Sequence, residues 1–201
     1  MKLRNNFYLR DDVVAVGRDL LGKVLSTEIH GELTKIVITE TEAYAGVTDK
    51  ASHAFGGRRT RRTEPMFGRG GAAYVYLCYG IHHLFNVVTN VEGTPDAVLI
   101  RAGHPLEGAD VMLARRDKRI VDSKLLAGPG SLAKALGITT GLTGHSLQSD
   151  EVWIEDHGID VLANDIQAGP RVGVGYAQED ALLPYRFRVN ISSCPVELLK
   201  D

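Results

Sequence analysis

The stretch IVITETEAYAGVTDKASH, which begins at Ile36, constrains the fold of this chain more than any other. Its first half alternates with the period of a β-strand, in which successive side chains point to opposite faces. One face would therefore run from two isoleucines into Glu40, Glu42 and Tyr44. Because the inner face of a half-buried strand is normally apolar, this face must either emerge into solvent or open into a polar pocket.

The residues after this strand favour the pocket. Acidic residues near a strand end usually lie in solvent, but here Tyr44 is followed by a polar turn, by His53 and by residues 54–71, AFGGRRTRRTEPMFGRGG, whose composition is that of a loop. The loop carries five arginines: Arg58, Arg59, Arg61, Arg62 and Arg69. Arginine-rich loops are often simply solvated, and the functional interpretation of this one is contact with phosphates.

Length and composition narrow the class of protein. With 201 residues, we expect a single domain spanning 1–201. The sequence has neither an apolar run long enough to span a membrane nor a signal peptide, and Cys78 and Cys194 do not suggest a disulfide framework, so a reducing cytoplasm is the simplest setting. The net charge of −2 argues against a generic nucleic-acid coat, and a polyanion would need a local basic face.

Turn and periodicity signals predict the order of the other elements. Asp11 and Asp12 would cap a helix that ends at Gly22, and His30-Gly31 would join two strands in a hairpin. The remaining predictions are a hairpin over 73–90 with Tyr79 to His82 at or near its tip, a short strand 97–102, a helix opened by Pro105, a helix from Pro129 to Gly137, and strands at 151–158, 170–177 and 185–190.

Several side chains on these elements are candidates for function. Tyr79 at a hairpin tip would have little to pack against, and Asn86, an amide among apolar residues, must find hydrogen-bond partners or face a pocket. Arg101 would pair with a carboxylate or bind an anion. His82 and His83 are adjacent on a strand and point apart, and no companion ligand motif is present, so we expect no metal.

Six pieces of the sequence resemble, in content and order, segments of the 3-methyladenine (alkylpurine) DNA glycosylases, the single-domain base-excision family typified by the mammalian alkyladenine enzyme. They are TEAY, SHAFGGRRTRR, AYVYLCYGIHHLFNVV, AVLIRA, AGPGSLAKALGI and PRVGVGYA, and together they cover about Leu21 to Val189. The resemblance implies an α+β fold: a single compact domain with a mostly antiparallel curved β-sheet, flanking helices and a protruding β-hairpin. The long N-terminal extension of the mammalian form is absent, which implies a bacterial-type member, cytoplasmic and bound to the nucleoid through DNA.

The resemblance also assigns roles by position. Glu42 matches the catalytic glutamate, Arg101 the arginine near the attacking water, and Tyr79 the tyrosine inserted into the DNA stack. The residues that match the base-binding pocket are Tyr44, His53, Tyr76 and Asn86. The residues expected to contact the DNA backbone are Arg58, Arg59, Arg61, Arg62, Arg69, Gly130 and Ser131, the last standing where the mammalian form has a basic residue.

The chemistry of these residue types agrees with the resemblance. A base inside a duplex must be flipped out before its glycosidic bond can be reached, and an inserted Tyr79 would fill the hole that it leaves. Tyr44 and Tyr76 would stack on the base, and Glu42 would activate the water. We expect a monofunctional enzyme, acting without metal or cofactor as a monomer on double-stranded DNA with damaged purines (3-methyladenine, 7-methylguanine, hypoxanthine, ethenoadenine) and leaving an abasic site.

Two alternatives of other classes remain at this point. A carbohydrate hydrolase could use Glu40 and Glu42 as its acid pair, since strand residues two apart are separated by about 6.6–6.8 Å, a spacing compatible with inversion. The arginine loop and Tyr79 would then have no purpose. A non-catalytic DNA-binding module would explain the arginines but not the acidic strand, because acids repel phosphates.

Overall fold

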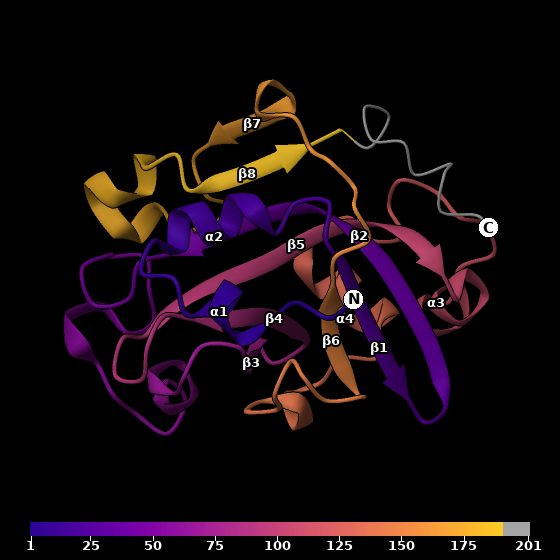
Figure 1. The fold of residues 1–201 in the computed structure, drawn as a ribbon, viewed down its shortest axis with the longest axis horizontal. Coiled ribbons are helices and arrows are strands. Elements are labelled where there is room, and N and C mark those ends of the chain that lie inside the picture. The colour runs from indigo at the N-terminus through magenta and orange to yellow at the C-terminus, as the bar shows by residue number, and fades with distance from the viewer. Residues whose placement is uncertain (191–201) are drawn as a thin grey trace.

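A long strand, β2 (Glu32–Tyr44), runs through the centre of the structure, a computed structural model that describes residues 1–190 (Figure 1). On one side it pairs with β5 (Asp96–Glu107) along nearly its whole length. On the other side its first half pairs with β1 (Val24–Ile29) and its second half with β8 (Arg186–Val189). The half that carries the two glutamates is therefore held between strands from distant parts of the chain.

The rest of the sheet extends from these central strands. Its order is β3-β4-β5-β2-β1-β6, β8 pairs with both β2 and β7, and every pairing is antiparallel. The outer strands are β3 (Ala73–Cys78), β4 (His82–Thr89), β6 (Val152–Glu155) and β7 (Ile166–Gly169). Together with the helices this sheet confirms the predicted α+β class.

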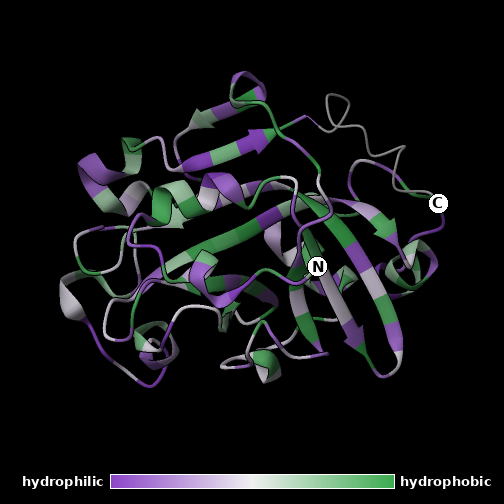
Figure 2. Cartoon of the chain, viewed as in Figure 1, coloured by the Kyte–Doolittle hydropathy of each residue, from purple (hydrophilic) through white to green (hydrophobic). Residues whose placement is uncertain are grey.

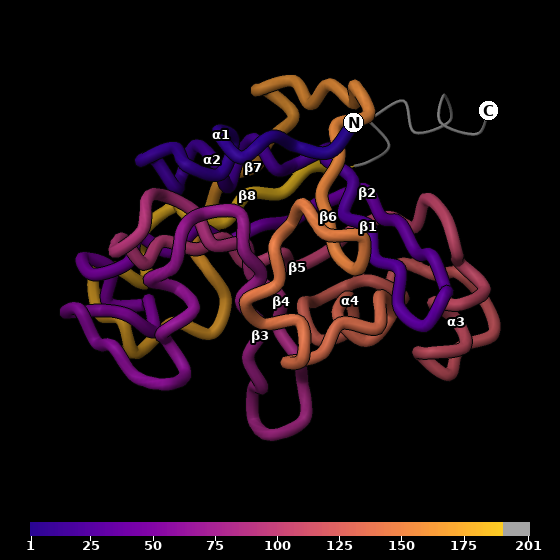
Figure 3. Tube along the Cα trace, turned by 60° about the horizontal axis from the view of Figure 1, so that its bottom comes forward, coloured from indigo at the N-terminus to yellow at the C-terminus, as the bar shows by residue number. Residues whose placement is uncertain are grey.

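Residues 1–190 also contain four α-helices and several short 3-10 segments. The helices are α1 (Asn5–Tyr8), α2 (Val13–Asp19), α3 (Ala109–Arg116) and α4 (Pro129–Ala135). The 3-10 segments are Phe55–Gly57, Glu64–Phe67, Thr140–Leu142, Ala163–Asp165 and Gly175–Leu182. α2 packs over β2, β5 and β8, α4 packs over β4 and β5, and Figure 3 shows these two helices on opposite sides of β5. Within the described residues, no helix has the length and apolar character needed to cross a membrane.

The core forms where α2 meets the sheet. The Asp12 carboxylate accepts a hydrogen bond from the Ala15 N–H at 2.9 Å, which confirms the predicted cap of this helix. Gly17 lets α2 approach β2 closely, because a Cβ there would lie 3.3 Å from the Ala43 Cβ, and the Thr41 hydroxyl donates to the Gly17 carbonyl at 2.6 Å. Figure 2 shows hydrophobic residues along the central strands and hydrophilic ones in the outer loops. Thr41 and Ala43 thus face the core, and the opposite face of the same strand is left for Glu42 and Tyr44.

The hairpin of β3 and β4 is the projecting part of the molecule (Figure 3). Tyr79 and Gly80, with φ angles of 50° and 73°, are the central residues of its turn, and the Ile81 N–H donates to the Cys78 carbonyl at 3.1 Å. Two positive φ angles define the type I′ turn that favours tight hairpins, and Asn or Gly normally occupies both positions. A tyrosine at the first position is strained backbone, and 92% of Tyr79 is exposed. The predicted hairpin with Tyr79 at its tip is confirmed.

Two predicted elements are wrong. Pro105 does not open a helix, because β5 continues to Glu107 and α3 begins only at Ala109. β4 pairs only with residues 96–99 of β5, so a proline beyond that point removes no hydrogen bond to β4. Residues 170–177 form no strand either: they are loop as far as Val174 and 3-10 from Gly175. Cys194 lies outside the described residues.

Candidate active site

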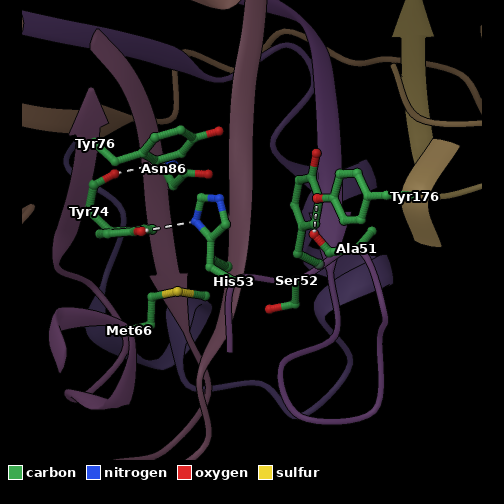
Figure 4. A pocket seen from close by; sticks show the side chains of 10 residues that line it. Ala51, Ser52, His53, Met66, Tyr74, Tyr76, Asn86 and Tyr176 are labelled. Atoms are coloured by element: carbon green, nitrogen blue, oxygen red, sulfur yellow. Dashed lines mark hydrogen bonds between the residues drawn. The ribbon is translucent and has the colours of Figure 1, made fainter. Parts of the chain in front are cut away.

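A cavity of about 340 Å³, including its open mouth, lies where the end of β2 meets β3, β4 and β5. It collects the four predicted pocket residues from three separate parts of the chain, together with two tyrosines that the sequence did not assign to it. These six residues are Tyr44, His53, Tyr74, Tyr76, Asn86 and Tyr176. In Figure 4, Tyr74, Tyr76 and Asn86 lie on one side of the space and Tyr176 on the other.

The walls of the cavity are aromatic. The rings of His53 and Tyr76 meet edge to face with centroids 4.6 Å apart, and those of Tyr74 and Tyr76 lie 5.6 Å apart. The Tyr176 hydroxyl donates to the Ala51 carbonyl at 3.0 Å, and two thirds of this residue is exposed at the mouth. A slot between aromatic walls suits a planar, aromatic guest, which both walls can contact by stacking.

His53 is fixed as a neutral imidazole. Its Nε2 lies 3.3 Å from an Arg62 nitrogen, and its Nδ1 lies 3.0 Å from the Tyr74 hydroxyl. Because a guanidinium can only donate, Nε2 must accept, and the ring proton is therefore on Nδ1, directed toward Tyr74. Burial, together with the positive charges of Arg62 and Arg58, lowers the pKa of His53 to about 4. At neutral pH this side chain carries no charge, and both of its ring nitrogens have partners within the protein.

Asn86 has one orientation. It is 4% exposed, and its amide nitrogen donates to the Tyr74 carbonyl at 3.1 Å and to the Leu84 carbonyl at 3.2 Å. Both amide hydrogens are therefore used by the backbone of the hairpin, and the side-chain oxygen is the atom left to face the cavity (Figure 4). A side chain held in this way presents a fixed edge to whatever enters.

Glu42 is fully buried directly behind Tyr44 and is not itself part of the cavity wall. It accepts hydrogen bonds from the Tyr44 hydroxyl at 2.8 Å and from the Val172 N–H at 2.7 Å, and Arg101 lies 3.4 Å away. Burial, followed by the charge of Glu42, raises the pKa of the Tyr44 hydroxyl well above its usual range, so this hydroxyl remains a donor. These three partners, one of them charged, compensate the desolvation of a buried carboxylate.

Glu40 lies beside Glu42 but has different partners. Its carboxylate accepts from Arg101 at 3.1 Å and from Arg186. Since Arg101 reaches both acids, they share a face of β2 as predicted, although the pairing register with β5 shifts on either side of Glu40. Glu40 does not contribute to the cavity wall and is held between two arginines, so it is poorly placed to act as the second acid of a glycoside hydrolase.

The five arginines of the 54–71 loop are all exposed, but they differ in their partners. Arg59 forms a two-pronged ion pair with Glu64 at 2.7 and 2.8 Å, and Arg62 lies over the Tyr76 ring at 4.9 Å. In the described part of the chain, no ion pair involves the other three: Arg58, Arg61 and Arg69. Arg58 and Arg62 also line a second hollow that shares His53 and Tyr176 with the cavity.

The other two predicted contact residues lie beside the first residue of β4, close to the tip of the hairpin. Gly130 and Ser131 are in the first turn of α4, half-buried, and a Cβ on Gly130 would lie 3.0 Å from the His82 ring. Gly130 therefore allows the start of this helix to sit against the hairpin. Across residues 1–190, no group of three or more His, Cys, Asp or Glu side chains is arranged to hold a metal ion.

Comparison with known proteins identifies the class of protein. The relatives include proteins of Chlamydia abortus (45% identical, over 95% of this chain and all of the relative), Desulfitobacterium hafniense (44%, over 92% and 94%) and Clostridium acetobutylicum (42%, over the whole of both chains), each provisionally named a 3-methyladenine DNA glycosylase. The class is thus that of the DNA glycosylases, hydrolases that act on N-glycosyl bonds. The sequence model of the Methylpurine-DNA glycosylase family matches residues 6–193, and this chain belongs to that family.

Sequence reasoning missed the contribution of the 170–182 segment to this site. Val172 supplies a backbone N–H to Glu42, and Tyr176 supplies an aromatic ring at the mouth. The signal in the sequence is the piece PRVGVGYA, which begins at Pro170 and whose pattern predicts a strand. A backbone donor leaves no trace in residue identity, whereas an aromatic residue in a glycine-rich loop is a signal that could have been used.

Proposed function

We propose that this enzyme flips alkylated or deaminated purines out of double-stranded DNA into the aromatic cavity and hydrolyses the N-glycosidic bond with a water activated by Glu42. The observation that carries this proposal is the fully buried Glu42, joined by a 2.8 Å hydrogen bond to a tyrosine of the cavity wall. The substrate set would be 3-methyladenine, 7-methylguanine, hypoxanthine and ethenoadenine. The enzyme would act as a monomer in the bacterial cytoplasm, on the nucleoid.

The cavity suits the recognition of a flipped purine. Tyr44 and Tyr76 come from different strands and would stack on the two faces of the base, each contact contributing about 1–3 kcal/mol. The neutral His53 would contact the base without repelling a cationic lesion. Stacking is stronger for electron-poor, alkylated purines, which carry positive charge toward the π-faces of the tyrosines.

Bond cleavage follows from the surroundings of Glu42. As the glycosidic bond breaks, positive charge develops on the sugar, and a carboxylate stabilises that charge and accepts a proton from the attacking water. Arg101 lies between Glu40 and Glu42, and its positive charge offsets the repulsion between the two neighbouring carboxylates. Among residues 1–190 no lysine lines the cavity, so the chemistry ends with hydrolysis and an abasic site, and no Schiff base forms.

The direct test is incubation of the enzyme with duplex DNA that carries one 3-methyladenine or one hypoxanthine. Free base should be released, and the strand should stay intact until alkali or an abasic-site nuclease is added. Strand scission without that treatment would show a lyase step and contradict the monofunctional assignment. An absence of free base from all four lesions would overturn the proposed function.

Replacement of Tyr79 with serine should impair excision without lowering stability. Tyr79 is 92% exposed, and serine has the same Cβ at φ 50°, so the substitution should leave the free energy of unfolding nearly unchanged. Excision should fall most for lesions in stable base pairs. It should fall least for mispaired lesions, because flipping these out of the duplex costs less free energy. Single-turnover rates on matched and mismatched hypoxanthine duplexes provide the measurement. Equal rates for wild type and variant on the stable pair would mean that the tip does not act as a wedge.

Arg58 and Arg59 provide a matched pair of variants for testing contact between the protein and the DNA backbone. Arg58→Gln should reduce the slope of log affinity against log salt by about 0.9, the value for one phosphate contact. Arg59→Gln should have a smaller effect, because Arg59 is already paired with Glu64. Both effects should be the same on undamaged DNA, since phosphate contacts carry no sequence information. If the salt slope of Arg58→Gln equalled that of wild type, Arg58 would lie outside the DNA interface.

A further inference from the structure

A buried ion pair between Asp49 and Arg171 lies next to the active site, and neither residue belongs to the cavity wall. Their side chains are 1% and 0% exposed, and the contact is two-pronged: one guanidinium nitrogen meets Asp49 Oδ2 and the other meets Oδ1 at 2.8 Å. The two residues are 122 positions apart in the sequence. The pair therefore joins two segments that are distant in the sequence, and hydrogen bonds from Lys50 to Asp180 and from Tyr176 to Ala51 join the same two segments.

On its acidic side, the pair organises the turn that leaves β2. The Asp49 carboxylate accepts from the Ala45 N–H at 3.1 Å and from the Ala51 N–H at 2.9 Å. This turn leads directly to His53, whose ring is part of the cavity. Asp49 thus fixes the path of the backbone between the two walls to which Tyr44 and His53 belong.

On its basic side, the pair contacts β2, the strand that carries Glu42. Arg171 donates to the Ala43 carbonyl at 2.8 Å, and its guanidinium lies over the Tyr44 ring, 4.8 Å from the ring centre. One face of this ring is thereby covered, and the other is free to line the cavity. The next residue, Val172, donates its backbone N–H to Glu42 at 2.7 Å. A single arginine thus sets the position of both Tyr44 and the hydrogen-bond donor of Glu42.

Stability alone does not account for this arrangement. Two charges removed from water are costly, and a buried ion pair is on average no more stabilising than apolar residues of similar volume. The Nε of Arg171 is also buried without a hydrogen-bond partner in the described structure, which adds to that cost. The ion pair fixes the geometry of the neighbouring groups, which an apolar contact would not do.

We propose that Asp49 and Arg171 are positioning residues for excision: their ion pair holds Tyr44 in its stacking position and aims the Val172 N–H at Glu42. This proposal rests on the function proposed above and assigns neither residue a contact with the substrate. It implies that a change of geometry at the pair slows the chemical step more than it weakens the binding of damaged DNA.

The first test replaces Arg171 with lysine, which keeps the charge but loses the planar two-pronged contact and the stacking on Tyr44. The control is Arg115→Lys, because Arg115 also joins a carboxylate and two backbone carbonyls, at Glu32, Ala135 and Ile29, away from the cavity. Single-turnover excision of hypoxanthine at saturating enzyme should fall at least 10-fold for Arg171→Lys and remain at the wild-type value for the control. The dissociation constant for lesion DNA should change by less than the rate.

A second pair of variants keeps the proposal testable if Arg171→Lys does not fold. Val172→Pro removes the N–H that meets Glu42, and Val172→Ala keeps it, while the side chain at this position is about half exposed. The proline variant should be at least 10-fold slower than the alanine variant. The acid limb of its pH–rate profile should also lie at higher pH, because the charged carboxylate has lost a hydrogen bond; a merely structural role would not move this limb.

The outcomes separate this proposal from the function on which it rests. If wild-type enzyme releases no base from any lesion, the proposed function itself fails. If wild type is active and folded Arg171→Lys retains its rate and its pH profile, the positioning role is overturned. Equal rates for Val172→Pro and Val172→Ala would overturn it as well, by showing that this N–H is not needed by Glu42.

Discussion

Glu42→Gln is expected to lose nearly all base excision while still binding lesion-containing DNA. The amide has the shape of the carboxylate, and its oxygen can still accept from the Val172 N–H, so the buried site should remain folded. It cannot accept a proton from water or offer a full negative charge to the sugar. Removal of a general base typically costs about 10²–10⁴-fold in rate, and we expect a loss of at least about 100-fold here, measured as single-turnover release of hypoxanthine.

The matched control is Glu40→Gln, two residues away on the same strand. Glu40 is held by Arg101 and Arg186 and is not part of the cavity wall, so its variant should keep activity within a few-fold. The reverse result, an active Glu42→Gln and an inactive Glu40→Gln, would move the catalytic role to Glu40.

The dependence of wild-type excision on pH checks the same role. A cationic lesion such as 3-methyladenine needs no proton on the leaving base, so its rate should fall only on the acid side. A neutral lesion such as hypoxanthine also needs an acid, and its profile should be a bell. Identical profiles for the two lesions would contradict a mechanism in which both need the same base but only the neutral lesion also needs an acid.

Asn86→Ser is expected to give the enzyme a new activity, the removal of undamaged guanine. Guanine and hypoxanthine differ by one exocyclic amino group, and stacking between tyrosines cannot distinguish them. The Asn86 amide is held by two backbone carbonyls and cannot rotate away, so a base edge that carries an extra group would clash with it. A shorter serine would open that space. We expect guanine release from G·T duplexes to rise at least about 10-fold, within the range that one group in a pocket can discriminate.

The measurement compares free guanine from G·T duplex for wild type and variant, with hypoxanthine release as the reference. The variant also loses two buried hydrogen bonds, so a second buried amide serves as the control for stability. Asn90→Ser removes an amide that binds Asp96 outside the cavity and should lower stability without releasing guanine. If folded Asn86→Ser releases no more guanine than wild type, Asn86 is a structural amide and selectivity lies elsewhere.

Local patterns in the sequence predicted much of the fold and part of the site. The Asp12 cap, the His30-Gly31 turn and the hairpin with Tyr79 at its tip all follow from rules that act over a few residues, and the structure has all three. The cavity also collects Tyr44, Tyr76 and the other two residues assigned to it by resemblance. Their roles in catalysis remain predictions.

The parts of the fold and the site that the sequence did not predict depend on contacts between distant segments. Pro105 has the signature of a helix start, yet pairing with β2 keeps it in a strand, and only the position where β4 ends makes a proline acceptable there. The partners of Glu42 were only partly predictable: Arg101 was expected near it, whereas the Val172 N–H is a backbone atom 130 residues away. No periodicity within a short window contains that information.

The pairing of β2 with β8 has a consequence for the order in which the parts of the active site form during synthesis of the chain. Residues 40–42 pair with Arg186 to Arg188, near the end of the described chain, while β1 and β5 are synthesised long before. A nascent chain that ends before Val172 can pair β2 with β1 and β5 but leaves Glu42 without its backbone donor. Synthesis therefore completes the central strands first and the backbone donor of Glu42 last, and a prematurely terminated product would carry the cavity walls of β3 and β4 without that donor.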